Sequence, residues 1–106
     1  MANWRDPIHP GEVLANELKE IGLNGHQLAK HLHLPYGRVY DILRGERSIT
    51  AATALSLGQF LRTGPEFWLN LQQHYDLEIA QKENRTILKK IKPFPGSQDY
   101  QVETHV

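Results

Sequence analysis

Two short amphipathic segments joined by a tight turn constrain this chain more than any other feature. The first segment begins after Asn24, and Gln27 stands three residues later, which is the spacing of a capping box at a helix start. The second segment follows Pro35, a residue that interrupts one helix and can start the next, and Gly45 ends it. Residues 24–45 therefore predict a helix-turn-helix.

Helices are also predicted on both sides of this motif. The first opens at Pro10 and stops at Gly22, since glycine easily adopts a left-handed C-terminal cap. Another follows Thr50, which suits an N-cap, and the last runs from Pro65 to at least Gln81. Apolar residues at helical spacing supply the inner faces of the first four helices, namely Leu14, Leu18, Ile21, Leu28, Ala29, Leu32, Val39, Ile42, Leu43, Ala54, Leu57 and Leu61.

The fifth helix carries a wide stripe made of Phe67, Trp68, Leu71 and Tyr75. Core or dimer packing explains this stripe better than a cofactor pocket, and Trp68 is the expected core anchor. Residues 87–91 permit a helix extension or a short strand, and the alternation at 100–106 permits a strand or a loose tail. The predicted fold is all-α, with a five-helix domain at residues 8–80 and a C-terminal extension at 81–106.

The composition excludes several functional classes. The 106 residues suit one small domain, and 40% hydrophobic with 23% charged residues is normal for a globular protein. The absence of cysteine excludes a disulfide scaffold, a thiol nucleophile and a cysteine zinc site. No apolar run approaches the roughly 18 residues of a membrane helix, and the N-terminus has no signal-peptide core. We therefore expect a cytoplasmic protein with no membrane partner.

The formal net charge of zero conceals an alternation along the chain. Residues 24–47 carry four cations against two acids, a net of +2, together with three histidines. The flanking segments 1–23 and 48–80 each carry −2, and residues 81–106 carry +2. The basic segment is therefore a candidate for contact with nucleic acid, whereas the neutral total argues against a nonspecific nucleic-acid coat.

The second helix of the motif has an outer face that suits DNA recognition. In a helix-turn-helix this helix enters the major groove, and its first residues face base edges. Arginine can bind a guanine or a phosphate, and tyrosine can hydrogen-bond a base or touch a thymine methyl. The ordinary alternatives are a solvated basic face for the cations and partial packing for the tyrosines. The residues predicted to contact DNA are Asn24, His26, Gln27, Lys30, Tyr36, Gly37, Arg38, Tyr40, Arg44 and Arg47.

Several histidines raise the question of metal or acid–base chemistry. His31 and His33 are two residues apart on a predicted helix, so they point apart, and no carboxylate cluster accompanies them. His9 and His74 each have an acid nearby but no nucleophile or phosphate-binding loop. We expect His9 to fix the start of the first helix instead. The sequence thus predicts no enzyme, no metal site and no cofactor.

Several stretches of the chain resemble a known family. Residues 27–32 (QLAKHL) and 42–50 (ILRGERSIT) resemble the helix-turn-helix of phage-repressor (XRE) type. Residues 8–14 (IHPGEVL), 64–72 (GPEFWLNLQ) and 75–77 (YDL) are similar to HigA-type antitoxins, also called virulence-associated protein I. The resemblance covers about residues 8–80 and implies a phage-repressor-like fold. Gly25 departs from the family pattern, which often has a glutamine there that braces a phosphate.

The resemblance implies a dimeric autorepressor that binds a palindromic operator in its own promoter and silences a HigB-type ribonuclease toxin. Two candidate surfaces suit a basic toxin or an added strand: the acidic residues Glu12, Glu17 and Glu20, and the C-terminal tail. Two alternatives stay open. One is a stand-alone repressor of the same type without a toxin. The other is an interaction module that has lost DNA binding, which the zero net charge and Gly25 permit.

Overall fold

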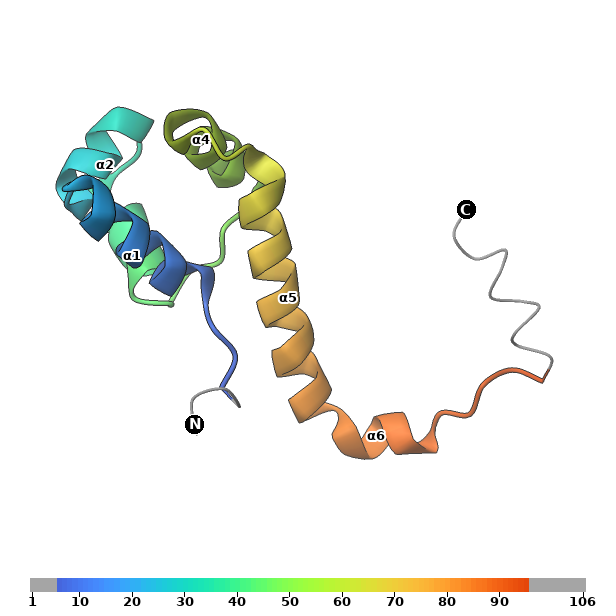
Figure 1. The fold of residues 1–106 in the computed structure, drawn as a ribbon. Helices are drawn as coiled ribbons and strands as arrows, with labels where there is room; N and C mark the ends of the chain where they lie inside the picture. Colours follow the sequence, from blue (N-terminus) through green and yellow to red (C-terminus); the bar gives the residue numbers. More distant parts are fainter. Residues whose placement is uncertain (1–5, 96–106) are drawn as a thin grey trace.

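The computed structural model describes residues 6–95, which form six α-helices (Figure 1). These are α1 (Pro10–Ile21), α2 (Gly25–Leu32), α3 (Tyr36–Leu43), α4 (Ala51–Leu61), α5 (Pro65–Glu83) and α6 (Arg85–Lys90). Helices α1 to α4 gather around the start of α5, whose second half leads away from them, and α6 turns aside (Figure 1). The all-α prediction and the helix-turn-helix at α2 and α3 are confirmed.

The number of helices differs from the prediction of five. Within residues 6–95 the segment for which an extension or a strand was predicted forms the separate short helix α6. The break lies at Asn84, whose Nδ2 donates a hydrogen bond to the Ala80 carbonyl at 2.7 Å and whose backbone leaves the helical conformation, at φ −113°. The strand or loose tail predicted at residues 100–106 lies outside the described residues.

Short-range hydrogen bonds start and stop the helices as the sequence predicts. The Nδ1 atom of His9 accepts a hydrogen bond from the Gly11 N–H at 2.8 Å, which makes His9 the N-cap of α1. Gly22 ends this helix in the left-handed conformation, at φ 76°. The Thr50 hydroxyl accepts from the Thr53 N–H at 3.3 Å and caps α4.

One hydrophobic core joins α1 to α5 around Trp68, which is 0% exposed and donates from Nε1 to the Thr63 hydroxyl at 2.9 Å. The predicted anchor role of Trp68 is confirmed. Ile21 was predicted to face inward, and this is wrong: it is 46% exposed, because α1 ends at this residue. Phe67 is only partly covered, through its edge-on contact with the Trp68 ring.

Two glycines bring helices into backbone contact. A Cβ atom at Gly11 would lie 1.9 Å from the carbonyl oxygen of Ile42, so α1 meets the end of α3 where no side chain fits. A Cβ atom at Gly58 would lie 2.3 Å from the carbonyl carbon of Gly64, where α4 meets the start of α5. The close approach predicted at Gly58 is confirmed. The contact at Gly11 holds one side of α3 against the bundle, while its opposite side is exposed.

Candidate nucleic-acid interface

The face of α3 that the sequence predicts to contact DNA points outward. Val39 and Ile42 are buried in the core, and Leu43 is half-buried. The opposite side is open, with Tyr36 36% and Tyr40 42% exposed. All ten residues predicted to contact DNA are exposed, on α2, on α3 and in the loop that follows α3. Their contact with DNA stays a prediction, and their placement meets its first condition.

The N-terminus of α2 supplies the polar end of this surface. Asn24 Oδ1 accepts a hydrogen bond from the Gln27 N–H at 2.8 Å, and Gln27 Oε1 accepts one from the Asn24 N–H at 2.9 Å. This reciprocal pair is the predicted capping box. It uses the two carboxamide oxygens and leaves both NH2 groups without a partner among residues 6–95. Those groups and the open start of the helix suit a phosphate.

Aromatic rings run across the surface from α2 to α3. The rings of His26 and Tyr36 are stacked, with centroids 3.7 Å apart and an angle of 11° between their planes. The Tyr36 and Tyr40 rings follow at 5.5 Å, and the Arg44 guanidinium carbon lies 4.7 Å from the centroid of Tyr40. Residues 36, 40 and 44 share one side of the helix, because they are four residues apart. The four side chains thus form one exposed row.

Two cations of the surface are unpaired within the described part of the chain. Lys30 and Arg38 are exposed and have neither an ion pair nor a hydrogen bond there. Gly37 is exposed between Tyr36 and Arg38 on α3, and a Cβ atom at this position would meet nothing within 4 Å. No packing inside the chain therefore requires glycine at this position. A close approach of the helix backbone to a ligand gives it a reason.

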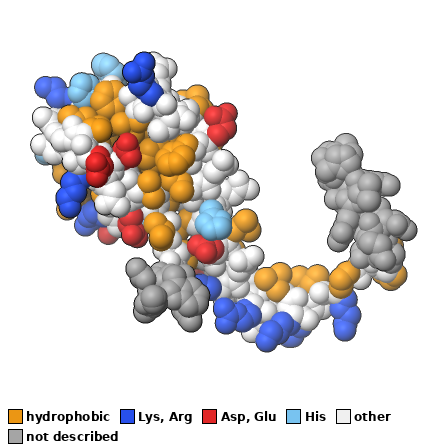
Figure 2. Space-filling view, in the orientation of Figure 1, with side chains coloured by type: hydrophobic (Ala, Val, Ile, Leu, Met, Phe, Trp, Pro, Cys, Tyr) orange, Lys and Arg blue, Asp and Glu red, His pale blue; other side chains and the backbone are white. Residues whose placement is uncertain are grey.

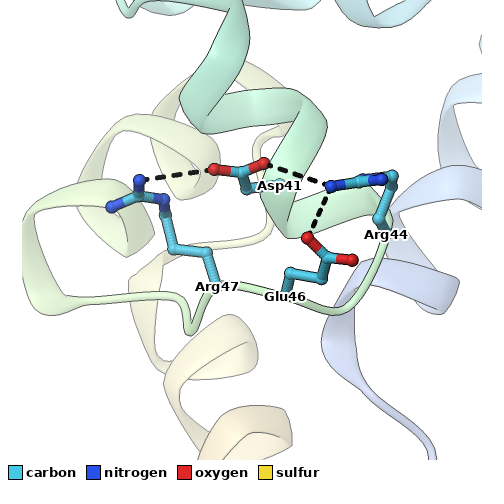
Figure 3. A network of polar contacts seen from close by, with 4 residues as sticks. All are labelled: Asp41, Arg44, Glu46 and Arg47. Atoms are coloured by element: carbon cyan, nitrogen blue, oxygen red, sulfur yellow. Dashed lines mark hydrogen bonds and ion pairs between the residues drawn. The ribbon is translucent and has the colours of Figure 1, made fainter.

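The other two predicted cations are engaged in a network at the end of α3 (Figure 3). Arg44 pairs with Glu46 and, at 3.8 Å, with Asp41, while the opposite oxygen of Asp41 lies 3.4 Å from Arg47. All these side chains are at least one third exposed, so the pairs contribute about 0–1 kcal/mol each. Arg44 and Arg47 can therefore exchange their carboxylates for phosphates at small cost.

Gln72, which was not predicted as a site residue, fixes the loop after α3. Gln72 of α5 is only 5% exposed, and its Oε1 accepts a hydrogen bond from the Ile49 N–H at 2.8 Å. Its Nε2 donates to Asp76 Oδ1 at 3.0 Å and to the Ser48 hydroxyl at 3.4 Å. The available signal was its spacing: Gln72 lies four residues after Trp68, so a polar side chain occupies an inward position.

His9, His31 and His33 each have a structural role or contact within the described residues. The ring of His31 stacks on Phe60, with centroids 4.6 Å apart, and His33 ends α2 in the left-handed conformation, at φ 57°. Burial lowers the pKa of His9, an effect that the carboxylates of Glu12 and Asp76 partly oppose. Within residues 6–95 no three histidine or carboxylate side chains gather to hold a metal, and no helix is long and apolar enough to cross a membrane.

Known proteins share this chain's sequence and fold. No protein-family model matches the chain. Virulence-associated protein I of Dichelobacter nodosus is 46% identical over 86 residues, which are 80% of each chain. A solved addiction module antidote protein of the HigA family, from Coxiella burnetii, is 53% identical and superimposes with a TM-score of 0.81 over 84% of this chain and 99% of that one. Antitoxin HigA of Pseudomonas aeruginosa, solved with the higBA promoter, is 40% identical, with a TM-score of 0.80 over 83% and 98% of the two chains.

Proposed function

This chain belongs to the HigA family of helix-turn-helix antitoxins, the family of virulence-associated protein I, and from that premise we propose that it represses its own promoter and neutralises a HigB-type ribonuclease toxin. The observation that carries the DNA-binding part is the open face of α3. It belongs to a chain 40% identical to an antitoxin solved with promoter DNA. In the proposed complex Tyr36, Arg38 and Tyr40 face base edges, and Lys30, Arg44 and Arg47 bind phosphates.

A dimer is part of this proposal. One recognition helix reads only a half-site, and two copies related by a two-fold axis place their helices about 34 Å apart in successive major grooves. The arm made of the second half of α5 and α6 supports a contact with a second copy, because it leaves Leu77, Ile87, Leu88 and Ile91 about half exposed or more. Hydrophobic side chains line one edge of α6 and lysines and arginines line the other (Figure 2).

The acidic side of α1 supports a toxin contact. Glu12, Glu17 and Glu20 are exposed on this helix, and a toxin that cleaves RNA is expected to be basic. The second candidate, the tail beyond residue 95, lies outside the described residues. In this proposal the protein acts by binding alone and has no enzymatic activity. It acts in the cytoplasm, where its promoter lies. His9 supports this view, since its imidazole is committed to capping α1.

A binding measurement with the full chain tests the repressor. Fluorescence anisotropy with labelled DNA from the chain's own promoter should give tighter binding than a scrambled duplex, and the affinity should fall steeply with salt because phosphate contacts release counterions. Equal affinity for both duplexes would refute sequence-specific repression.

A short basic open reading frame immediately upstream would support the antitoxin, and co-expression with it tests the toxin partner. The two proteins should co-purify, and this chain should restore the growth of cells that the toxin inhibits. Promoter binding without any rescue or co-purification would favour the stand-alone repressor instead.

A further inference from the structure

The exposed row formed by His26, Tyr36, Tyr40 and Arg44 begins next to Gly25, a residue without a side chain. A Cβ atom at Gly25 would lie 3.1 Å from Cε1 of Tyr36 and 3.2 Å from Cδ1 of Leu43, closer than side chains normally pack. Glycine at the first position of α2 therefore leaves room for the Tyr36 ring to lie against this helix. A longer residue at position 25 would push that ring away.

His26 then covers the Tyr36 ring from one face. The two planes are nearly parallel, at 11°, and the centroids are 3.7 Å apart. Within residues 6–95 Tyr36 is the only aromatic or polar side-chain partner that His26 has. His26 is exposed, so it adds nothing to the core. Its side-chain contact is the stacking on Tyr36.

We propose that His26 is a positioning residue, which holds Tyr36 in one direction on the free protein so that Tyr36 meets an operator base already oriented. This inference rests on the proposed promoter binding. Tyr36 is the first residue of α3, the position from which a recognition helix faces base edges. A tyrosine that is 36% exposed would otherwise lose side-chain freedom on binding. The row that continues through Tyr40 to Arg44 limits the same motion from the other side.

A double-mutant cycle on promoter affinity separates positioning from direct contact. His26→Ala should weaken binding about three- to tenfold, the effect of ordering one side chain, and His26→Phe should restore most of it. Adding His26→Ala to Tyr36→Ala should cause no further loss, because His26 acts through Tyr36. His31→Ala is the matched control: it removes a histidine of the same helix that stacks on Phe60, away from α3, and should leave affinity unchanged.

Two further measurements keep the inference open to refutation. Gly25→Ala should weaken binding in the same direction, because its Cβ atom would displace the Tyr36 ring. In the free protein, His26→Ala should shift the ring-proton resonances of Tyr36 through loss of the neighbouring ring. Unchanged affinity in His26→Ala, or an equal loss with and without Tyr36, would refute the positioning role alone. Failure of the wild-type chain to prefer its promoter would refute the repressor as well.

Discussion

The imidazole ring of His9 meets the phenol ring of Tyr75 edge-on, with centroids 4.9 Å apart and planes at 72°. His9 precedes α1 and Tyr75 belongs to α5, so this contact joins the start of the bundle to its longest helix. On another side the His9 ring faces Gly45, where a Cβ atom would lie 3.6 Å from the imidazole. One ring therefore packs against α5 and against the loop after α3 at once.

The buried His9 makes the stability of the fold depend on pH. Burial lowers its pKa below the ordinary value of 6.5, so the unfolded chain binds a proton more readily than the folded one. The stability contribution is full above pH 6.5 and is lost as the pH falls from 6.5 through the lowered pKa. Protonation of Nδ1 would also remove the acceptor for the Gly11 N–H. Urea unfolding between pH 7.5 and 5 should show this loss.

His9→Asn is the control for this pH dependence, because asparagine can cap α1 and does not titrate in this range. The difference in unfolding free energy between wild type and His9→Asn should narrow toward acid pH. Parallel curves for the two proteins would show that His9 is not responsible.

The hydrogen bond from the Ile49 N–H to Gln72 predicts a large cost for losing the carboxamide. Gln72→Leu would leave that N–H buried without a partner, and we expect a loss of about 1–3 kcal/mol in unfolding free energy. The matched control is Gln73→Leu, at the exposed neighbouring position, which should change stability by less than about 0.5 kcal/mol. Similar midpoints for the two variants in urea would contradict the role of Gln72.

Two glycines should respond to alanine in opposite ways. Gly11→Ala would place a Cβ atom against the Ile42 carbonyl, so α1 and α3 must move apart and the thermal midpoint should fall by several degrees.

Gly37→Ala meets no atom of the chain and should stabilise α3 by up to about 1 kcal/mol. If the helix backbone approaches DNA closely, the same variant should bind its promoter more weakly. Gain of stability together with unchanged affinity would argue against that approach.

Features set by neighbouring residues were predictable from the sequence, and those set by distant ones were not. The partners in the Asn24–Gln27 capping box and the His9 cap lie only two or three positions apart, so residue type and spacing were sufficient. Ile21 continues the apolar period of α1, and only the packed structure shows that the core does not reach it. The Gln72–Ile49 hydrogen bond joins residues 23 apart, and no local pattern specifies its partner.

In the candidate DNA surface, too, local features were predictable from the sequence and features that depend on distant residues were not. The list of exposed residues on α3 followed from subtracting the apolar positions, because helix periodicity fixes both faces together. The pairing of Arg47 with Asp41 did not follow, since it depends on how the loop after α3 folds back beside Asp41. The room that Gly25 leaves for the Tyr36 ring could not be predicted from the sequence, because it depends on how α2 and α3 lie relative to each other.

The double variant Arg38→Ala/Tyr40→Ala should abolish the preference for the promoter. A good base contact contributes about 1–3 kcal/mol of discrimination, so the two together should lower affinity for the promoter about a hundredfold and that for scrambled DNA far less. Both side chains are exposed, so the thermal midpoint should stay within a few degrees of wild type. Lys19→Ala removes an equal charge from α1 and serves as control. Undiminished discrimination in the double variant would exclude these residues from base recognition.

Asp41 restrains both cations at the end of α3 and should therefore limit DNA affinity. Asp41→Asn removes a negative charge from the surface and weakens the pairs with Arg44 and Arg47, so affinity for any duplex should rise several-fold and its salt dependence should steepen. Stability should change by less than about 1 kcal/mol, because the pairs are exposed. Glu17→Gln, the same charge change on α1, should have a smaller effect. A weaker complex in Asp41→Asn would instead mean that Asp41 orients the arginines, and anisotropy titrations at two or more salt concentrations distinguish these outcomes.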